Sequence, residues 1–188
     1  MQRMGTCYEL SAEKIAHFQS IPWCSEILRE GDYTPVGIPP NKSRVPNEES
    51  LLSETLQTDN TIRKAVVYVR NRPSETPEET LVLYDLGSGV NGFPNICHGG
   101  FVATLLDEVT GVLITVRNTS QKKTLPFMTA NLNVTFRKPV ATPGVVLARA
   151  RVVKSLGRKL WIEGSLENQH GDVCSTVSAL FVELKGVL

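Results

Sequence analysis

The chain has 188 residues, which predicts one domain with an extension and leaves enough length to bury a core. Its 20 Lys and Arg residues nearly balance 19 Asp and Glu residues, and the net charge of +1 excludes a large nucleic-acid footprint. The longest apolar stretch, residues 101–116, contains two acids and is short for a membrane span, and the first residues lack a signal-peptide pattern. We therefore expect a soluble intracellular protein without a membrane span, in the cytoplasm or, as the alternative, in mitochondria.

The cysteines and histidines do not form a metal-binding pattern. The chain has four cysteines, Cys7, Cys24, Cys97 and Cys174. They lack the paired spacing of a zinc site and the density of a disulfide scaffold. His17 and His170 have no partners at ligand spacing. We expect reduced thiols and no metal.

Residues 1–60 differ from the rest of the chain and predict an arm. Ser11 is placed to cap a short helix that runs through Phe18, and a second short helix is expected after Pro22. Residues 35–50 contain four prolines, too many for regular structure, and predict an extended segment. The arm is expected to dock on a main domain that covers residues 61–188.

The main domain alternates between strand patterns and one long helical pattern. Apolar residues recur at three-and-four spacing through residues 99–116, which predicts a helix with a buried stripe. Strands are expected at 63–69, 80–86, 129–136, 145–153, 159–167 and 173–184. Strands, one helix and then more strands favour an α+β fold in which an antiparallel sheet curls around a central helix.

The predicted helix begins with chemistry that suits a carbonyl substrate. Gly99 and Gly100 follow His98, and their missing side chains would let a carbonyl oxygen approach the free N–H groups of the first turn. The helix dipole favours negative charge at this position. Asp107 follows within the same helix and could act as a base or a nucleophile. Alternatively, Gly99 and Gly100 are only a joint between a loop and a helix.

Several motifs in order give the chain, from about residue 61 to 184, a family resemblance. They are His98-Gly99-Gly100, Asp107 nine positions after the histidine, the strand 132–136 followed by Pro139, and Gly157-Arg158-Lys159. With these motifs the chain resembles the hotdog-fold acyl-CoA thioesterases, in particular the phenylacetate-degradation-type branch. The resemblance implies hydrolysis of an acyl-CoA without a cofactor, since coenzyme A is part of the substrate. It also implies a homodimer or dimer of dimers with the active site between subunits.

The resemblance also assigns roles to individual residues. It makes Asp107 the catalytic carboxylate. In a monomer, however, a helical wheel places this residue as an ordinary solvent-facing acid. Glu108 is the substitute if Asp107 does not act. It makes the hydroxyl of Thr129 a group that assists the carboxylate. A threonine present only for its β-propensity is an equally good explanation. His98 would brace the loop, and a nucleophilic pair with Cys97 is not expected.

Further residues are candidates for substrate binding. Asn91 and Asn95 lie in the loop before the helix, where relatives carry an amide that holds the carboxylate or substrate, although turn formation explains both residues as well. The phosphates of coenzyme A need basic partners. The candidates for this role are Arg137, Lys138, Arg158 and Lys159. Basic residues at strand ends are equally expected as solvated edge protection.

Two other functions are compatible with this pattern. One is a catalytically weak acyl-CoA-binding or regulatory module in which the arm binds a partner, and the presence of Asp107 argues against it. The other is a hotdog dehydratase, whose usual His and Asp motif is absent from the sequence. If the protein is the expected hydrolase, the arm could also serve as a lid over the acyl channel.

Overall fold

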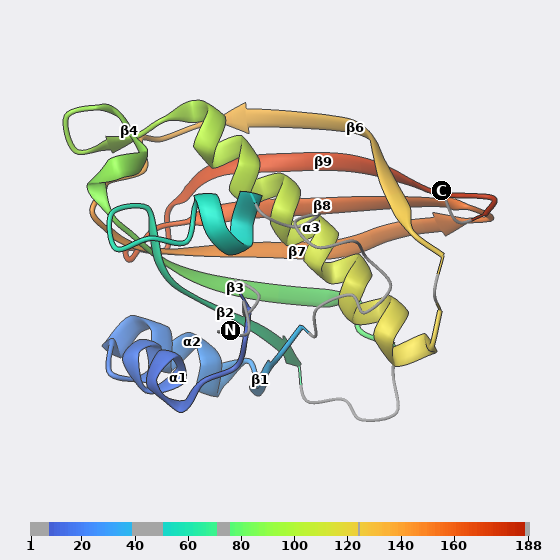
Figure 1. Cartoon of the computed structure of the whole chain (residues 1–188), viewed down its shortest axis with the longest axis horizontal. Helices are drawn as coiled ribbons and strands as arrows, with labels where there is room; N and C mark the ends of the chain where they lie inside the picture. Colours follow the sequence, from blue (N-terminus) through green and yellow to red (C-terminus); the bar gives the residue numbers. More distant parts are fainter. Residues whose placement is uncertain (1–7, 39–50, 71–75, 124, 187–188) are drawn as a thin grey trace.

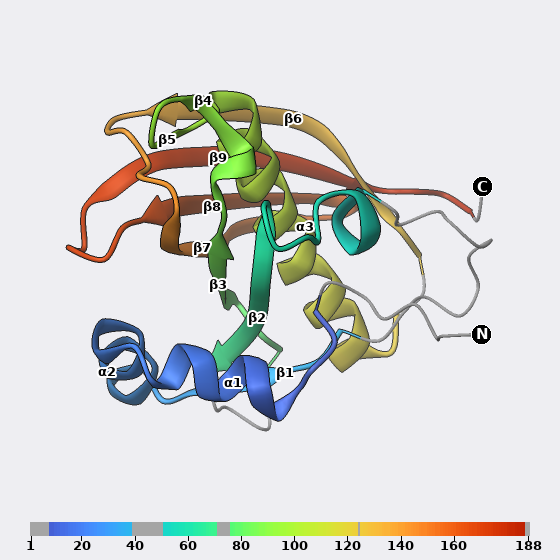
Figure 2. The same cartoon turned by 60° about the vertical axis from the view of Figure 1, so that its left-hand side comes forward.

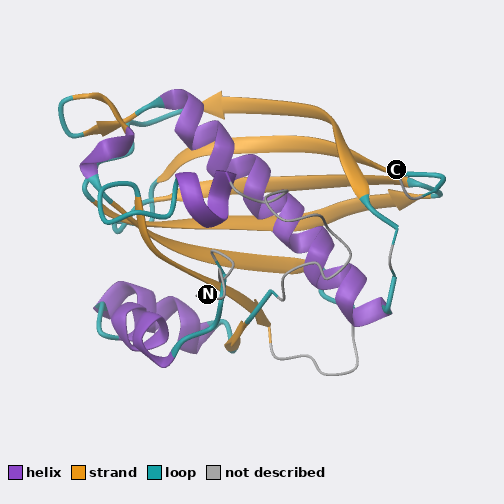
Figure 3. Ribbon diagram, in the orientation of Figure 1, coloured by secondary structure: helices purple, strands orange, loops and turns teal. Residues whose placement is uncertain are grey.

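An antiparallel sheet wraps around one long helix in the computed structural model, which describes residues 8–38, 51–70, 76–123 and 125–186 (Figure 1). The sheet has seven strands in the order β1-β2-β3-β7-β8-β9-β6. Their bounds in this order are Tyr33–Val36, Ile62–Arg70, Glu79–Leu86, Gly144–Leu156, Lys159–Glu167, Val173–Glu183 and Phe127–Phe136. The predicted α+β class and antiparallel sheet are confirmed, and the six predicted strands are present (Figure 3).

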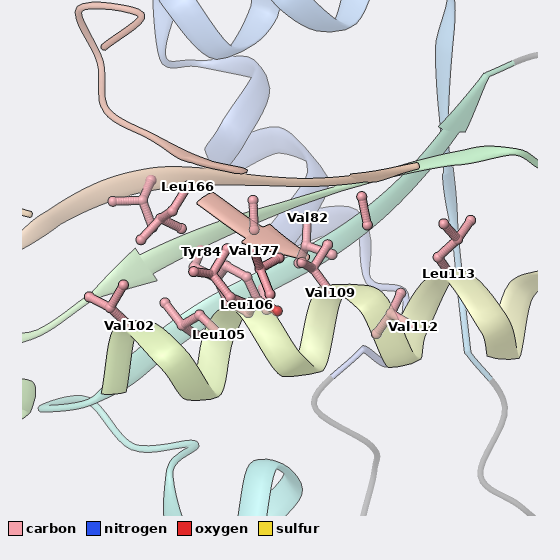
Figure 4. Close-up of a cluster of buried hydrophobic side chains, with 14 of the residues drawn as sticks. Val82, Tyr84, Val102, Leu105, Leu106, Val109, Val112, Leu113, Leu166 and Val177 are labelled. Carbon is pink, nitrogen blue, oxygen red and sulfur yellow. The ribbon is translucent and has the colours of Figure 1, made fainter. Parts of the chain in front are cut away.

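The long helix α3, Gly99–Gln121, lies across the concave face of the sheet and forms the core with it. The predicted apolar stripe faces the strands: Val102, Leu105, Leu106, Val109, Val112 and Leu113 are each at most 4% exposed (Figure 4). Inward-facing strand residues such as Val82, Tyr84 and Val177 pack against it. Alternation along each strand thus separates this inner face from an outer face.

Helix α3 is longer than the sequence pattern predicts. It continues past residue 116 to Gln121 and ends where Lys122 adopts a left-handed conformation, φ 55°. With these residues it is long and apolar enough to cross a membrane by length and composition, contrary to the expectation from residues 101–116. Half of the apolar 18-residue stretch of this helix is buried inside the protein, as expected of a core helix.

The arm forms a second layer on the outer face of the sheet (Figure 2). Helix α1, Ala12–Gln19, begins at Ser11, whose Oγ accepts a hydrogen bond from the Lys14 N–H at 3.2 Å, and helix α2, Pro22–Glu30, follows it. Phe18 and Leu28 pack on outward-facing residues of β2, β3 and β7. Both predicted helices are confirmed.

The arm also extends the sheet. Strand β1 pairs with β2 at the sheet edge, although the sequence pattern indicated only an extended segment from residue 35. The larger part of that segment, residues 39–50, lies outside the described residues. Since α1 and α2 cover the face opposite α3, they are a structural layer of the sheet and do not form a lid over the start of α3.

Candidate active site

His98 and the first residues of α3 form a closed hydrogen-bonding unit. His98 is the N-cap, and its ring Nδ1 accepts a hydrogen bond from the Gly100 N–H at 3.0 Å. A Cβ at Gly100 would lie 3.0 Å from this Nδ1, which explains the glycine at position 100. Because Nδ1 is the acceptor, the neutral ring carries its proton on Nε2.

The two glycine amides therefore differ in availability. The Gly100 N–H already binds His98, whereas the Gly99 N–H has no hydrogen-bond partner among the described residues. Gly99 is exposed and lies in the first turn, where the helix dipole favours negative charge. A carbonyl oxygen would thus find one free glycine donor here and a second one only if the His98 ring moved.

A small hairpin of β4, Asn91–Phe93, and β5, Ile96–Cys97, holds His98 in place. The His98 N–H donates to the Val90 carbonyl at 2.8 Å. Gly92 passes close to the histidine, because a Cβ there would lie 3.0 Å from the His98 Cα. The sequence pattern did not predict this hairpin, which contacts the N-cap residue through Gly92.

The two predicted asparagines lie in this hairpin rather than beside Asp107. The side-chain amide of Asn91 is hydrogen-bonded to the Thr142 hydroxyl. Asn95 occupies the turn with φ 59°, a conformation that asparagine tolerates, and its carbonyl accepts a hydrogen bond from the Thr142 N–H at 3.1 Å. The structure thus gives both residues a role in the loop, and a role in substrate binding stays a prediction.

Cys97 does not have the properties of a nucleophile. The thiol is buried, and desolvation raises its pKa to about 12, so the reactive thiolate is not populated at neutral pH. Its Sγ lies 3.8 Å from the His98 carbonyl oxygen, to which it can donate a weak hydrogen bond. The His98 Nδ1 is already bound to Gly100, as described above. This geometry agrees with the expectation that Cys97 and His98 are not a catalytic pair.

Asp107 and Thr129 are in contact. The Thr129 hydroxyl donates to the Asp107 Oδ1 at 3.2 Å, which joins the middle of α3 to the start of β6. Asp107 is half-buried and Thr129 is exposed. A carboxylate held through one oxygen keeps the other available to accept a proton from water or to attack a carbonyl carbon. The pairing that the resemblance implied is therefore present, while its catalytic role stays a prediction.

Gly99 and Asp107 of the same chain are too far apart to act on one carbonyl group. They are separated by eight residues of a single helix, which corresponds to about 12 Å along the axis. A donor to the carbonyl oxygen and a base or nucleophile for the carbonyl carbon must both lie within about 3 Å of their targets. One chain therefore supplies two separated halves of the predicted site.

Phe136 lies beside the helix start. A Cβ at Gly99 would lie 3.7 Å from its ring, and the side chain is 57% exposed at the end of β6. The sequence pattern placed Phe136 only at the end of the expected strand 129–136. Its exposure could not be foreseen, because β6 is an edge strand with only β9 beside it.

The basic candidates lie at two opposite ends of the sheet. Arg137 and Lys138 follow β6 at the end where α3 begins, and Lys138 forms an ion pair with Asp172 at 2.5 Å. Arg158 lies in the turn between β7 and β8 at the other end, where it donates to the Glu183 carbonyl at 2.9 Å. Lys159 alternates with the inward-facing Leu160 and therefore points to the outer face. Only the first pair lies near the helix start of its own chain.

The described residues contain no cluster of three or more His, Cys, Asp or Glu side chains that could hold a metal ion.

The fold and the site residues define a class of protein. Residues 94–175, which include His98, Asp107 and Thr129, match the family model of the thioesterase superfamily. Among solved structures, thioesterase superfamily member 2 of zebra fish is similar at a TM-score of 0.54 and 18% identity, over 76% of this chain and 89% of that chain. A hypothetical thioesterase of Streptococcus pneumoniae with coenzyme A is similar at a TM-score of 0.52 and 15% identity, over 57% and 79%. These similarities confirm the hotdog fold.

Curated relatives are also found. The acyl-coenzyme A thioesterase THEM4 of Mus musculus is 30% identical over 59% of this chain and 46% of its own length. Verlamelin biosynthesis protein B of Lecanicillium is 33% identical over 55% and 58%. An uncharacterized mitochondrial membrane protein, FMP10 of Saccharomyces cerevisiae, is 28% identical over 68% and 51%. The chain thus spans about half the length of the curated relatives that it matches.

Proposed function

We propose that this protein hydrolyses an acyl-CoA thioester to the free acid and coenzyme A. The observation that carries the proposal is the contact between Thr129 and Asp107, which lies in the helix whose first residue, Gly99, has a free N–H. The relatives named acyl-coenzyme A thioesterase and the similar structure with coenzyme A support this substrate class. No cofactor is required, because coenzyme A is the leaving group.

The reaction uses three groups. The Gly99 N–H donates to the thioester oxygen and stabilises the negative charge that develops on it. Asp107 either takes a proton from a water that attacks the acyl carbon, or attacks that carbon itself and is released by water in a second step. Thr129 holds the carboxylate in position. The C–S bond then breaks, coenzyme A leaves as the thiolate, and the acid remains.

The proposed active unit is a homodimer in which Gly99 of one protomer and Asp107 of the other act on the same thioester. The separation of about 12 Å along α3 supports this arrangement, because one chain cannot place both groups on one carbonyl. Strand β6 has one free edge and carries exposed Phe136, which suits pairing with a second copy. A dimer of dimers would repeat the same site.

Within this proposal Arg137 and Lys138 bind phosphates of coenzyme A, because they lie at the end of the sheet where α3 begins. Phe136 packs against the substrate beside Gly99. We propose an intracellular location, in the cytoplasm or, as the relative named a mitochondrial membrane protein suggests, in mitochondria.

The test is turnover of short, medium, long and aromatic acyl-CoAs, followed by thiol release, for the wild type and Asp107→Asn. We expect hydrolysis by the wild type and a loss of about 10²- to 10⁴-fold in kcat for the variant, because the amide cannot accept the proton. Equal turnover of both proteins would remove Asp107 from the mechanism. Tight binding of every substrate without turnover would instead favour the acyl-CoA-binding module.

A further inference from the structure

Helices α1 and α2 leave part of the sheet's outer face open. Helices α1 and α2 cover outward-facing residues of β2, β3 and the beginning of β7, among them Tyr68, Leu81 and Leu147. The far end of β7 and the strands β8, β9 and β6 have none of the described helices on their outer side (Figure 2). This open region ends at the turn between β7 and β8.

Apolar side chains gather at that end of the outer face. The cross-strand register places Lys154 opposite Trp161, Trp161 opposite Leu180, and Val182 opposite Met128. Leu156 completes the group beside the turn. We call Met128, Leu156, Trp161, Leu180 and Val182 the turn-end patch. Leu156 is 63% exposed and Met128 is 42% exposed, while the other three are half-buried.

Basic side chains surround the turn-end patch. The Lys154 ammonium lies 5.0 Å from the centre of the Trp161 ring, and exposed Lys159 is opposite Leu156 in the register. Exposed Arg158 in the turn and exposed Lys185 after β9 add two further charges. The acid on this part of the outer face, Glu163, is paired with Arg151 at 2.8 Å. The patch therefore combines apolar and cationic groups.

We propose that the turn-end patch binds the surface of an anionic lipid bilayer. A tryptophan, an exposed leucine and several lysines on one face are the groups that enter the boundary between headgroups and acyl chains, where cations meet lipid phosphates and carboxylates. Leu156 is the last residue of β7 beside the turn, and as the most exposed member of the patch it enters the acyl region first. The inference does not depend on the proposed hydrolase activity, because α3 and Asp107 lie on the opposite face.

Charge distinguishes a bilayer from a second copy of this chain. A twofold contact through this face would bring each patch against itself and place Lys154, Arg158 and Lys159 near their own copies. Such like charges repel, whereas an anionic bilayer pairs with all of them.

The experiment is co-sedimentation of the full chain with vesicles of phosphatidylcholine alone and with vesicles that also hold about 30 mol% phosphatidylserine. We expect binding to the anionic vesicles and weak binding to the neutral ones. Leu156→Ser removes the apolar tip, and Lys159→Glu reverses a charge. Each should weaken the binding by about fivefold or more. Circular dichroism and the Tm verify that the variants are folded.

Two matched controls separate this surface from general exposure and charge. Val173→Ser removes an exposed aliphatic residue from the opposite end of β9, and Arg29→Glu reverses a charge at the end of α2. Both should bind anionic vesicles like the wild type. The proposal is overturned if the wild type ignores both vesicle types or if the patch variants bind unchanged. It is likewise overturned if, without lipid, Leu156→Ser splits an oligomer into smaller species, since the occupant would then be a second copy.

Discussion

Gly99 is a position where one backbone donor can be deleted while the helix is kept. It is the first residue of α3, where proline is well tolerated, and His98 before it has φ −63° and ψ 134°, which suits a residue that precedes proline. Gly99→Pro removes the free N–H. We predict a loss of about 10²- to 10³-fold in kcat with an unchanged Tm, because the developing charge loses its donor.

Gly99→Ala is the matched control for this variant. It keeps the N–H, and its Cβ would make an ordinary contact with the Phe136 ring at 3.7 Å. The alanine variant should therefore retain most of the wild-type kcat in the same thiol-release assay. If the proline variant is folded and equally active, the Gly99 amide does not polarise the substrate.

Thr129 offers a second test at the residue scale. Thr129→Val keeps the shape and the β-branch of the side chain but deletes the hydroxyl that donates to Asp107. We predict that kcat/KM falls about tenfold, which corresponds to the loss of one hydrogen bond to a charged group. Thr129→Ser retains the donor and should stay close to the wild type. If the valine and serine variants have equal kcat/KM, the Thr129 hydroxyl does not assist catalysis.

The sequence indicated the composition of the site better than its hydrogen bonds. The His-Gly-Gly motif and the spacing to Asp107 predicted a helix start followed by a carboxylate, and the structure has both on α3. That His98 occupies the Gly100 N–H could not be predicted, because it depends on the rotamer of one ring. The exposure of Phe136 depends on the order of strands in the sheet, which the pattern within a single strand does not encode.

At the scale of the elements, the arm is held mainly by burial of apolar side chains. Phe18 on α1 is fully buried between the arm and the outer face of β2 and β3. We predict that Phe18→Ala lowers the free energy of unfolding by about 3–5 kcal/mol, through lost burial and the cavity that remains. Urea unfolding followed by circular dichroism measures this change.

Phe93→Ala is the control for Phe18→Ala. Phe93 is 74% exposed in the hairpin before α3, so its truncation should change the free energy of unfolding by less than about 0.5 kcal/mol. A small effect at Phe18 as well would mean that α1 does not pack on the sheet in solution.

The elements were predictable to the extent that their periodicity is strong. The apolar stripe gave the beginning of α3 at Gly99, but residues 117–121 are polar, so the last turns did not follow from hydrophobic spacing. The sequence pattern did not predict strand β1, because Pro35 breaks a strand pattern. In the structure this proline lies in the edge strand, where its missing N–H affects only the pairing of β1 with β2. The hairpin of β4 and β5 is too short to show alternation.

At the scale of the whole molecule, the strand order determines which faces remain available for assembly. The order β3-β7 and β9-β6 joins strands that are distant in sequence and leaves β6 at the edge beside α3. Alternation within a strand predicts which side chains are buried but not which strand is its neighbour. The arm then covers only the half of the outer face under β2 and β3. Assembly is therefore expected through the β6 edge, where the two separated halves of the site can meet.

This assembly makes a quantitative prediction for mixed dimers. Gly99→Pro and Asp107→Asn damage different halves of the site, so a heterodimer purified with two tags pairs the intact Gly99 of one protomer with the intact Asp107 of its partner at one of two sites. We predict that this heterodimer recovers about half of the wild-type turnover, although each homodimer is nearly inactive.

The control is a heterodimer of an Asp107→Asn protomer with a Thr129→Val protomer. It has the same half of the site damaged in both protomers and should stay below this level. An inactive first heterodimer would mean that each site is built within one chain, which contradicts the separation of Gly99 and Asp107 along α3.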